Sequence, residues 1–298
     1  MRARNTYLLA AAASALAVGC SNDFDPPSLL NRLRVLSIDA DRQEAGPGET
    51  VTLRPRLFVP QGSTVATTEW RFCPLTLGPR AGYQCVAPEC DTVLAPTVDG
   101  SVTADPNALL VACALTFASR ADGGGLPGGV GVPETVEAVF RLKLTTADGD
   151  EEEVVNRYTV WTTRAPPERN RVPVITGVTV AAAAPDSMGR FAPVVETAKP
   201  FAEVEIAVTL DPASLDHYTD AIGNVFTEDP IISFYATAGR FKQDRSSGVR
   251  SFVKWKVEKL EPRDTEAVLY VVARDLRGGQ SLSGPYRIPI TRLPMMAP

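Results

Sequence analysis

The sequence predicts an all-β protein built from two antiparallel β-sandwich domains in tandem. Short runs in which apolar and polar residues alternate recur along the chain, turn-forming residues separate them, and long helical patterns are few. Alternation with a period of two is the pattern of a strand with one buried face, and many such strands in series are typical of sandwiches. A polar segment with three prolines at residues 164–173, RAPPERNRVP, divides the strand-rich region and predicts a linker over residues 166–172.

The first domain is expected over residues 32–165. An Asp148-Gly149 pair between two strand-like runs is a strong hairpin signal. Residues 107–119, NALLVACALTFAS, fit either a helix or a buried strand, because periodicity alone does not decide an apolar run of that length. The strands of this domain are expected at residues 34–38, 51–59, 69–73, 136–145 and 154–162.

The second domain is expected over residues 173–293, followed by a tail at 294–298. It repeats the same style of short strands and intervening turns, without a long helical pattern. Its strands are expected at residues 174–180, 203–210, 231–235, 249–257, 268–273 and 286–290.

The beginning of the chain has the layout of an export leader. Arg2 and Arg4 precede an apolar run at residues 7–18, which is shorter than the roughly 20 residues of a membrane-spanning helix. The run ends at LAVGC, where small residues lead directly into Cys20, and this resembles the lipobox of bacterial lipoproteins. The resemblance implies a signal peptide over residues 1–19, a lipidated Cys20 as the first mature residue, and a tether over residues 20–31.

The lipid on Cys20 is therefore expected to attach the protein to a membrane, since two or more acyl chains anchor a protein stably. The alternative is an ordinary cysteine after a plain export signal, but setting Cys20 aside leaves an even number of cysteines for disulfides. Ser21 follows Cys20, and in the lipoproteins that this leader resembles a residue other than aspartate there favours the outer over the inner membrane.

Two further phrases resemble immunoglobulin-like domains of bacteria. Residues 47–53, PGETVTL, look like opening strands of such a domain, and residues 271–279, VVARDLRGG, look like its final hairpin. The order of lipobox, PGETVTL, WRFC, proline-rich linker and VVARDLRGG resembles uncharacterised lipoproteins of myxobacteria. The resemblance implies immunoglobulin-like sandwiches in the cell envelope and brings no known activity with it.

The four remaining cysteines are expected to form two disulfides that staple an insertion after the strand at 69–73. Exported thiols tend to oxidise, and sequence alone leaves all three pairings open. The spacing in CVAPEC also suits a zinc site, but no histidine lies near it. The cysteines are Cys73, Cys85, Cys90 and Cys113.

An acidic loop offers a weak candidate for calcium binding. Asp211, Asp216 and Asp220 lie close together in sequence and could supply oxygen ligands, but the spacing of an EF-hand is missing, so an ordinary solvated turn is preferred and no cofactor is expected. His217, the single histidine, lies in the same loop without a GxSxG motif elsewhere to complete a catalytic triad. Residues 123–128 satisfy GxGxxG literally, but Pro127 and Pro133 predict a loop rather than a nucleotide site.

These observations together predict a membrane-anchored exported lipoprotein that is not an enzyme, but a binding or scaffolding module of the cell envelope. A net charge of −5 offers no footprint for nucleic acid, so an envelope protein or a glycan is the expected partner. Two alternatives stay open: a permanent component of an envelope assembly, and a carbohydrate-active hydrolase using a pair of carboxylates that sequence cannot identify.

Overall fold

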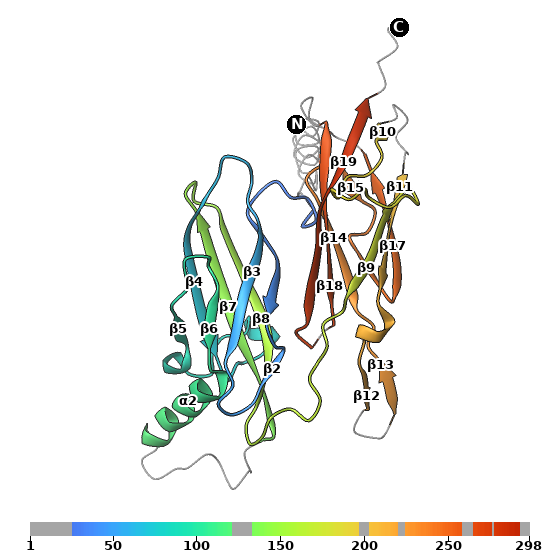
Figure 1. The fold of residues 1–298 in the computed structure, drawn as a ribbon. Helices are drawn as coiled ribbons and strands as arrows, with labels where there is room; N and C mark the ends of the chain where they lie inside the picture. Colours follow the sequence, from blue (N-terminus) through green and yellow to red (C-terminus); the bar gives the residue numbers. More distant parts are fainter. Residues whose placement is uncertain are drawn as a thin grey trace, which may run out of the picture.

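The computed structural model describes residues 26–120, 133–196, 203–219, 224–257, 265–275 and 277–292. Two β-sandwiches lie side by side with their strands running along a common direction (Figure 1). The prediction of an all-β protein made of sandwich domains is confirmed. Among the described residues, no helix is long and apolar enough to cross a membrane.

The first sandwich packs a three-stranded sheet against a five-stranded one. Buried Trp70, Phe72 and Phe140 fill the space between the sheets, and the indole Nε1 of Trp70 donates to the carbonyl of Gly100 at 2.9 Å. The three-stranded sheet has the order β1 (Arg34–Ala40), β3 (Val51–Phe58), β6 (Val102–Ala104), and the five-stranded sheet has the order β2 (Glu44–Ala45), β8 (Glu151–Trp161), β7 (Thr135–Thr146), β4 (Val65–Cys73), β5 (Thr92–Leu94).

The second sandwich packs a four-stranded sheet against a five-stranded one around Trp255 and Phe234, and adds a separate hairpin. The four-stranded sheet has the order β15 (Arg240–Phe241), β17 (Arg250–Lys256), β11 (Glu203–Leu210), β9 (Ile175–Val180). The five-stranded sheet has the order β10 (Val194–Glu196), β19 (Gln280–Arg292), β18 (Glu266–Arg274), β14 (Ile231–Ala236), β16 (Arg245–Ser247), and the hairpin joins β12 (His217–Thr219) to β13 (Val225–Thr227).

The two sandwiches open in the same way. In each, the first strand pairs antiparallel in the smaller sheet (β1 with β3, β9 with β11), and the chain then crosses to the larger sheet and pairs parallel with its last strand (β2 with β8, β10 with β19). The prediction of antiparallel sandwiches therefore misses these two short parallel pairs. They arise because the chain, once it has left the first strand of the domain, runs beside the last strand in the same direction as that strand.

Residues 107–119, which the sequence left undecided, belong to helix α2 (Pro106–Arg120). The helix begins after Asp105, whose carboxylate accepts the amide of Ala108 at 2.9 Å as an N-cap. Pro106 occupies the first turn, where its missing N–H is not needed. The described residues also form three short 3₁₀ helices: η1 (Pro79–Ala81), η2 (Pro88–Cys90) and η3 (Pro212–Ser214).

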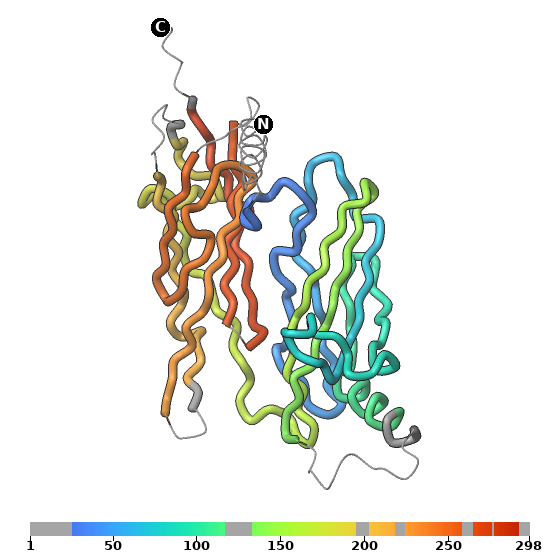
Figure 2. Tube along the Cα trace, turned by 180° about the vertical axis from the view of Figure 1, so that it is seen from behind, coloured from blue at the N-terminus to red at the C-terminus, as the bar shows by residue number. Residues whose placement is uncertain are grey.

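The described part of the expected tether, residues 26–31, does not hang free. Ser28 and Leu30 are 3% and 2% exposed, and both exchange backbone hydrogen bonds with Ala236 at the end of β14. Figure 2 shows this blue segment entering between the two domains, near the end of the second domain from which the chain also leaves. Apolar burial of Leu30 explains why the segment adheres to the second domain instead of extending from the first.

Candidate functional site

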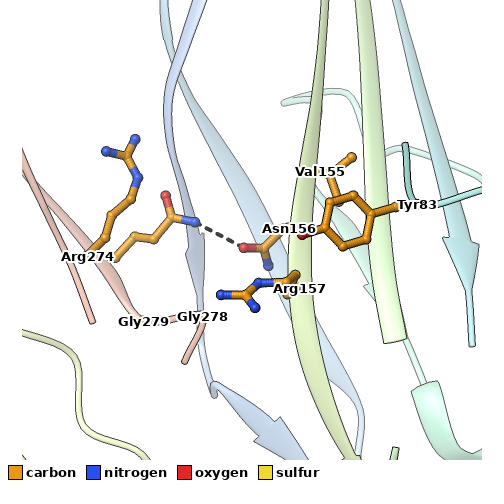
Figure 3. Close-up of a pocket in the computed structure, with 8 residues that line it drawn as sticks. Tyr83, Val155, Asn156, Arg157, Arg274, Gly278 and Gly279 are labelled. Carbon is orange, nitrogen blue, oxygen red and sulfur yellow. Dashed lines mark hydrogen bonds between the residues drawn. The ribbon is translucent and has the colours of Figure 1, made fainter. Parts of the chain in front are cut away.

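The candidate site is the junction between the two domains, where a pocket of about 200 Å³ opens (Figure 3). The first domain contributes residues of β8 and of the insertion between β4 and β5, and the second contributes the turn between β18 and β19. None of the eight lining residues is acidic. They are Tyr83, Val155, Asn156, Arg157, Arg274, Gly278, Gly279 and Gln280.

Three of the polar side chains that line this pocket, those of Asn156, Arg274 and Gln280, hold the domains together. The Gln280 amide donates to the Oδ1 of Asn156 at 3.0 Å, which is the dashed contact in Figure 3, and its Oε1 accepts the amide of Ile38 at 3.4 Å. The Arg274 guanidinium donates to the carbonyl of Leu36 at 2.6 Å and to Ser233 Oγ at 3.0 Å. These side chains thus have structural partners across the junction.

The turn between β18 and β19 comes close to β8 of the first domain, and the glycines of this turn make room for its backbone. Gly278 has a φ of +109°, and a Cβ there would lie 2.9 Å from the carbonyl oxygen of Arg157. A Cβ on Gly279 would lie 2.1 Å from a carboxylate oxygen of Asp275. Glycine at position 278 lets the second domain touch the strand of the first, and glycine at position 279 leaves room for the Asp275 carboxylate. The RGG of the sequence therefore has a role that sequence reasoning missed.

An apolar cluster extends the junction. Leu30, Leu36 and Val272 are fully buried in it. The β-bulge between Val35 and Ser37 turns Leu36 away from its own core, so β1 faces both domains. Phe58 of the first domain and Tyr270 of the second meet edge to face with ring centroids 6.4 Å apart, and Tyr235 and Leu282 also border the cluster.

A single arginine joins three carboxylates from the two domains. Arg277 lies 3.1 Å from Glu44 of the first domain, 3.3 Å from Asp216 and 3.4 Å from Glu228. Glu44 and Glu228 are buried, at 5% and 7% exposure. A buried carboxylate without a partner costs free energy, so Glu44 and Glu228 each need a cation beside them. Acids of both domains therefore hold Arg277 in its position.

Burial raises the pKa of Glu228 above its ordinary value, and the carboxylates of Asp275 and Asp216 raise it further, against the opposing effect of the Asp216 amide. Burial likewise raises the pKa of Asp275, opposed by the Asn170 amide, which donates to it at 2.7 Å. A raised pKa beside another carboxylate is typical of a glycosidase acid. Here, however, the acids surround Arg277 and lie outside the set of residues that line the pocket.

The linker is bound to both domains. Arg169 donates to the carbonyl of Glu44 at 3.2 Å and pairs with Glu49, both in the first domain. The amide of Arg171 donates to the carboxylate of Asp216 at 3.0 Å in the second. Ion pairs and backbone bonds therefore hold the linker at residues 169–171 in place.

The cysteines form the two expected disulfides, Cys73–Cys85 and Cys90–Cys113. The first closes the loop after β4, and the second ties η2 to α2. Sequence could not select this pairing because all four cysteines lie close together in the chain. Cys20 lies outside the described residues.

The acidic loop is used within the protein. Asp211 caps η3 by accepting the amide of Ala213 at 2.9 Å, Asp216 serves the junction, and Asp220 lies outside the described residues, as does the glycine motif at 123–128. His217 is exposed and its Nδ1 lies 2.9 Å from Thr227 Oγ1. In the part of the chain that the structure describes, no three histidine, cysteine or acidic side chains are grouped as a metal would need.

No protein-family model and no curated protein matches this chain. Among solved structures it is similar to the D00-D0 domain of intimin, at 11% identity over 86% of this chain and 98% of that one, with a TM-score of 0.23. The fibronectin(III)-like modules of CbhA from Clostridium thermocellum match at 11% identity over 86% and 94% of the two chains, with a TM-score of 0.27. The FN1-FN3 domains of chicken CNTN1 match at 13% identity over 87% and 66%, with a TM-score of 0.22.

Proposed function

We propose that this protein is a lipid-anchored, exported module of the bacterial cell envelope that binds or scaffolds and does not catalyse. The observation that carries the proposal is the junction. Its pocket is lined by no acid, and Arg274, Gln280 and Asn156 bond across it instead of pointing freely into it. A junction of this kind serves to fix the geometry of two sandwiches.

A fixed junction distinguishes this chain from domains on a flexible linker. Relative motion is the default for neighbouring domains unless their interface is large and apolar. Here an apolar cluster, three hydrogen bonds that join Arg274 and Gln280 to the first domain, and the Arg277 ion pairs act together. A rigid pair presents surfaces of both domains to one partner at a constant spacing, as a scaffold requires.

The anchor is tested by replacing Cys20. We expect Cys20→Ser to release the protein from the membrane fraction and to abolish incorporation of a labelled fatty acid. Ser21→Asp is the matched variant: it keeps the cysteine and is expected to move the protein from the outer to the inner membrane. Unchanged fractionation of Cys20→Ser, with an unlipidated mature N-terminus, contradicts the proposal.

The outer face of α2 favours a second candidate, a permanent component of an envelope assembly. Residues 106–119 contain no charged side chain, and Val111 and Leu115, one turn apart, are 50% and 64% exposed. An apolar helix face of this kind is typical of a docking surface. Ala108, Ala112 and Ala114 are exposed beside them.

A photo-crosslinker at Leu115 in intact cells tests this candidate. Recovery of one recurrent protein in near-stoichiometric amount supports an assembly component. The same crosslinker at Val98, which is fully exposed between β5 and β6, is the matched control and should capture no such partner. Enrichment of polysaccharide without a protein supports a glycan-binding module instead.

A further inference from the structure

We propose that one particular end of the molecule faces the membrane: the end of the second domain at which residues 26–31 dock, together with the β3–β4 turn of the first domain. We call it the anchor end. The opposite end, which carries α2 and the β12–β13 hairpin, faces away from the lipid (Figure 1). This orientation rests on the proposed lipidation of Cys20 and adds the surface that meets the bilayer.

The first step is the attachment of residues 26–31 to the second domain. The amide of Leu30 donates to the carbonyl of Ala236 at 2.8 Å, and the amide of Ala236 donates to the carbonyl of Ser28 at 2.9 Å. Leu30 is buried in the apolar cluster of the junction. A turn in which the amide of Leu29 donates to the carbonyl of Pro26 at 2.9 Å keeps Pro26 beside this contact.

The second step is the attachment of the same segment to the first domain. Leu33 is 1% exposed within the first core, and its amide donates to the carboxylate of Asp150 at 3.0 Å, in the turn between β7 and β8. Arg34 then begins β1 opposite Phe58, the last residue of β3. Residues 26–33 are therefore held by both domains at the same end of the molecule.

The third step is the reach of the chain. Five residues lie between Cys20 and Pro26, and the six steps from one Cα to the next span at most about 22 Å however they are arranged. From Ala236, β14, residues 228–230 and β13 lead back over eleven residues to Val225, a path of up to about 36 Å at the rise of a strand. Figure 1 shows the β12–β13 hairpin at the far end of the second domain. A lipid on Cys20 cannot reach a bilayer that touches the β12–β13 hairpin. The anchor end must therefore be the end that lies closer to the bilayer.

The test measures the height of four labelled positions above the lipid. The full-length lipoprotein is extracted from cells, reconstituted into vesicles of phosphatidylethanolamine and phosphatidylglycerol, and labelled with a donor dye on one introduced cysteine. The native disulfides leave no free thiol among Cys73, Cys85, Cys90 and Cys113. Energy transfer to a headgroup acceptor should be high for Gln61→Cys and Arg240→Cys, and low for Val225→Cys and Leu115→Cys.

A variant of the docked segment provides the control. Leu30→Asp places a charge in the apolar cluster and should reduce the difference between the two ends, because the tether lengthens. Arg32→Asp places the same charge at an exposed neighbour and should leave the difference unchanged. Both variants should still float with the vesicles.

The outcomes separate the two proposals. Failure of the unmodified lipoprotein to float with vesicles overturns the anchor, and the orientation with it. Flotation with equal transfer from all four positions, or with higher transfer from Val225→Cys and Leu115→Cys, overturns the orientation alone and leaves the anchor standing.

Discussion

The Cys90–Cys113 disulfide offers the sharpest test of how the first domain is held. It joins η2 to α2 across a sequence separation of 23 residues. Closing a loop of that length lowers the entropy of the unfolded chain, which corresponds to about 3.4 kcal/mol at 25 °C. The Cys90→Ser, Cys113→Ser double variant should lose about that much stability, or roughly 10–15 °C in the Tm of the first domain.

Hydrogen exchange identifies the elements that lose stability in the double variant. The other described contacts of α2 include the Asn107 amide, which donates to the carbonyl of Trp161 at 2.8 Å, and the half-buried Leu109 and Leu110. We expect the amides of α2 to lose protection in the double variant, while the amides of β7 and β8 keep theirs. The Cys73–Cys85 pair closes a separation of 12 residues, worth about 2.8 kcal/mol, and is the matched control because neither of its cysteines belongs to α2.

Two results would refute this reasoning. Unchanged protection of α2 in the Cys90→Ser, Cys113→Ser variant would mean that packing alone holds the helix. A loss of α2 protection in the Cys73→Ser, Cys85→Ser variant equal to that in the first would mean that the insertion unfolds as one unit, so that neither disulfide acts specifically on the helix.

Three further changes probe the junction and the second core. Leu36→Ala should cost about 2–5 kcal/mol in chemical denaturation and widen the interdomain distance in X-ray scattering, and an unchanged distance would show that polar contacts suffice. Because burial raises the pKa of Glu228, the folded state holds that proton more tightly than the unfolded chain. The free energy of unfolding should therefore fall as the pH rises from about 4.5 through the folded-state pKa. Glu228→Gln should reduce this dependence of the unfolding free energy on pH, measured by chemical denaturation. A pH dependence identical to that of the parent protein contradicts the prediction. Gly239→Ala places a Cβ 2.5 Å from Trp255 Nε1 at a φ of +75° and should lower the stability by roughly 2–4 kcal/mol. Gly62→Ala is the control: its Cβ meets no atom within 4 Å, and the variant should lose about 1 kcal/mol. Equal changes in Tm for the two variants would refute the steric reasoning.

Much of the fold could be predicted from the sequence because strand alternation is a local property. The runs at 51–59 and 203–210 each become a strand, β3 and β11, with alternate residues buried. The Asp148-Gly149 turn joins β7 to β8 as expected. The run at 107–119 stayed undecided because its apolar residues surround the helix without a clear stripe, and the deciding features are a cap and a disulfide.

The candidate site was harder to predict because its contacts join positions far apart in the chain. Arg277 meets Glu44 across 233 residues, and no local spacing reports such a pair. Cys20 is the opposite case: the pattern around it is local, so sequence identifies it, and it stays a prediction because it lies outside the described residues. The acids of the calcium candidate share a loop, yet Asp211 caps a helix and Asp216 binds arginine, since nearness in sequence does not bring their carboxylates together.

Departures from alternation were the signal that could have revealed the junction. A strand with one buried face buries every second residue, whereas a strand covered on both faces buries consecutive ones. Residues 35–38 of β1 and 271–273 of β18 are buried without interruption, and each strand carries one member of the interdomain cluster, Leu36 and Val272. Such runs mark strands that are covered on both faces. β7 has one as well, at residues 138–140, so the cover of the second face is not always the neighbouring domain. Gly278, which follows β18, adds to the signal, because a residue without a side chain at this position permits β8 of the first domain to approach.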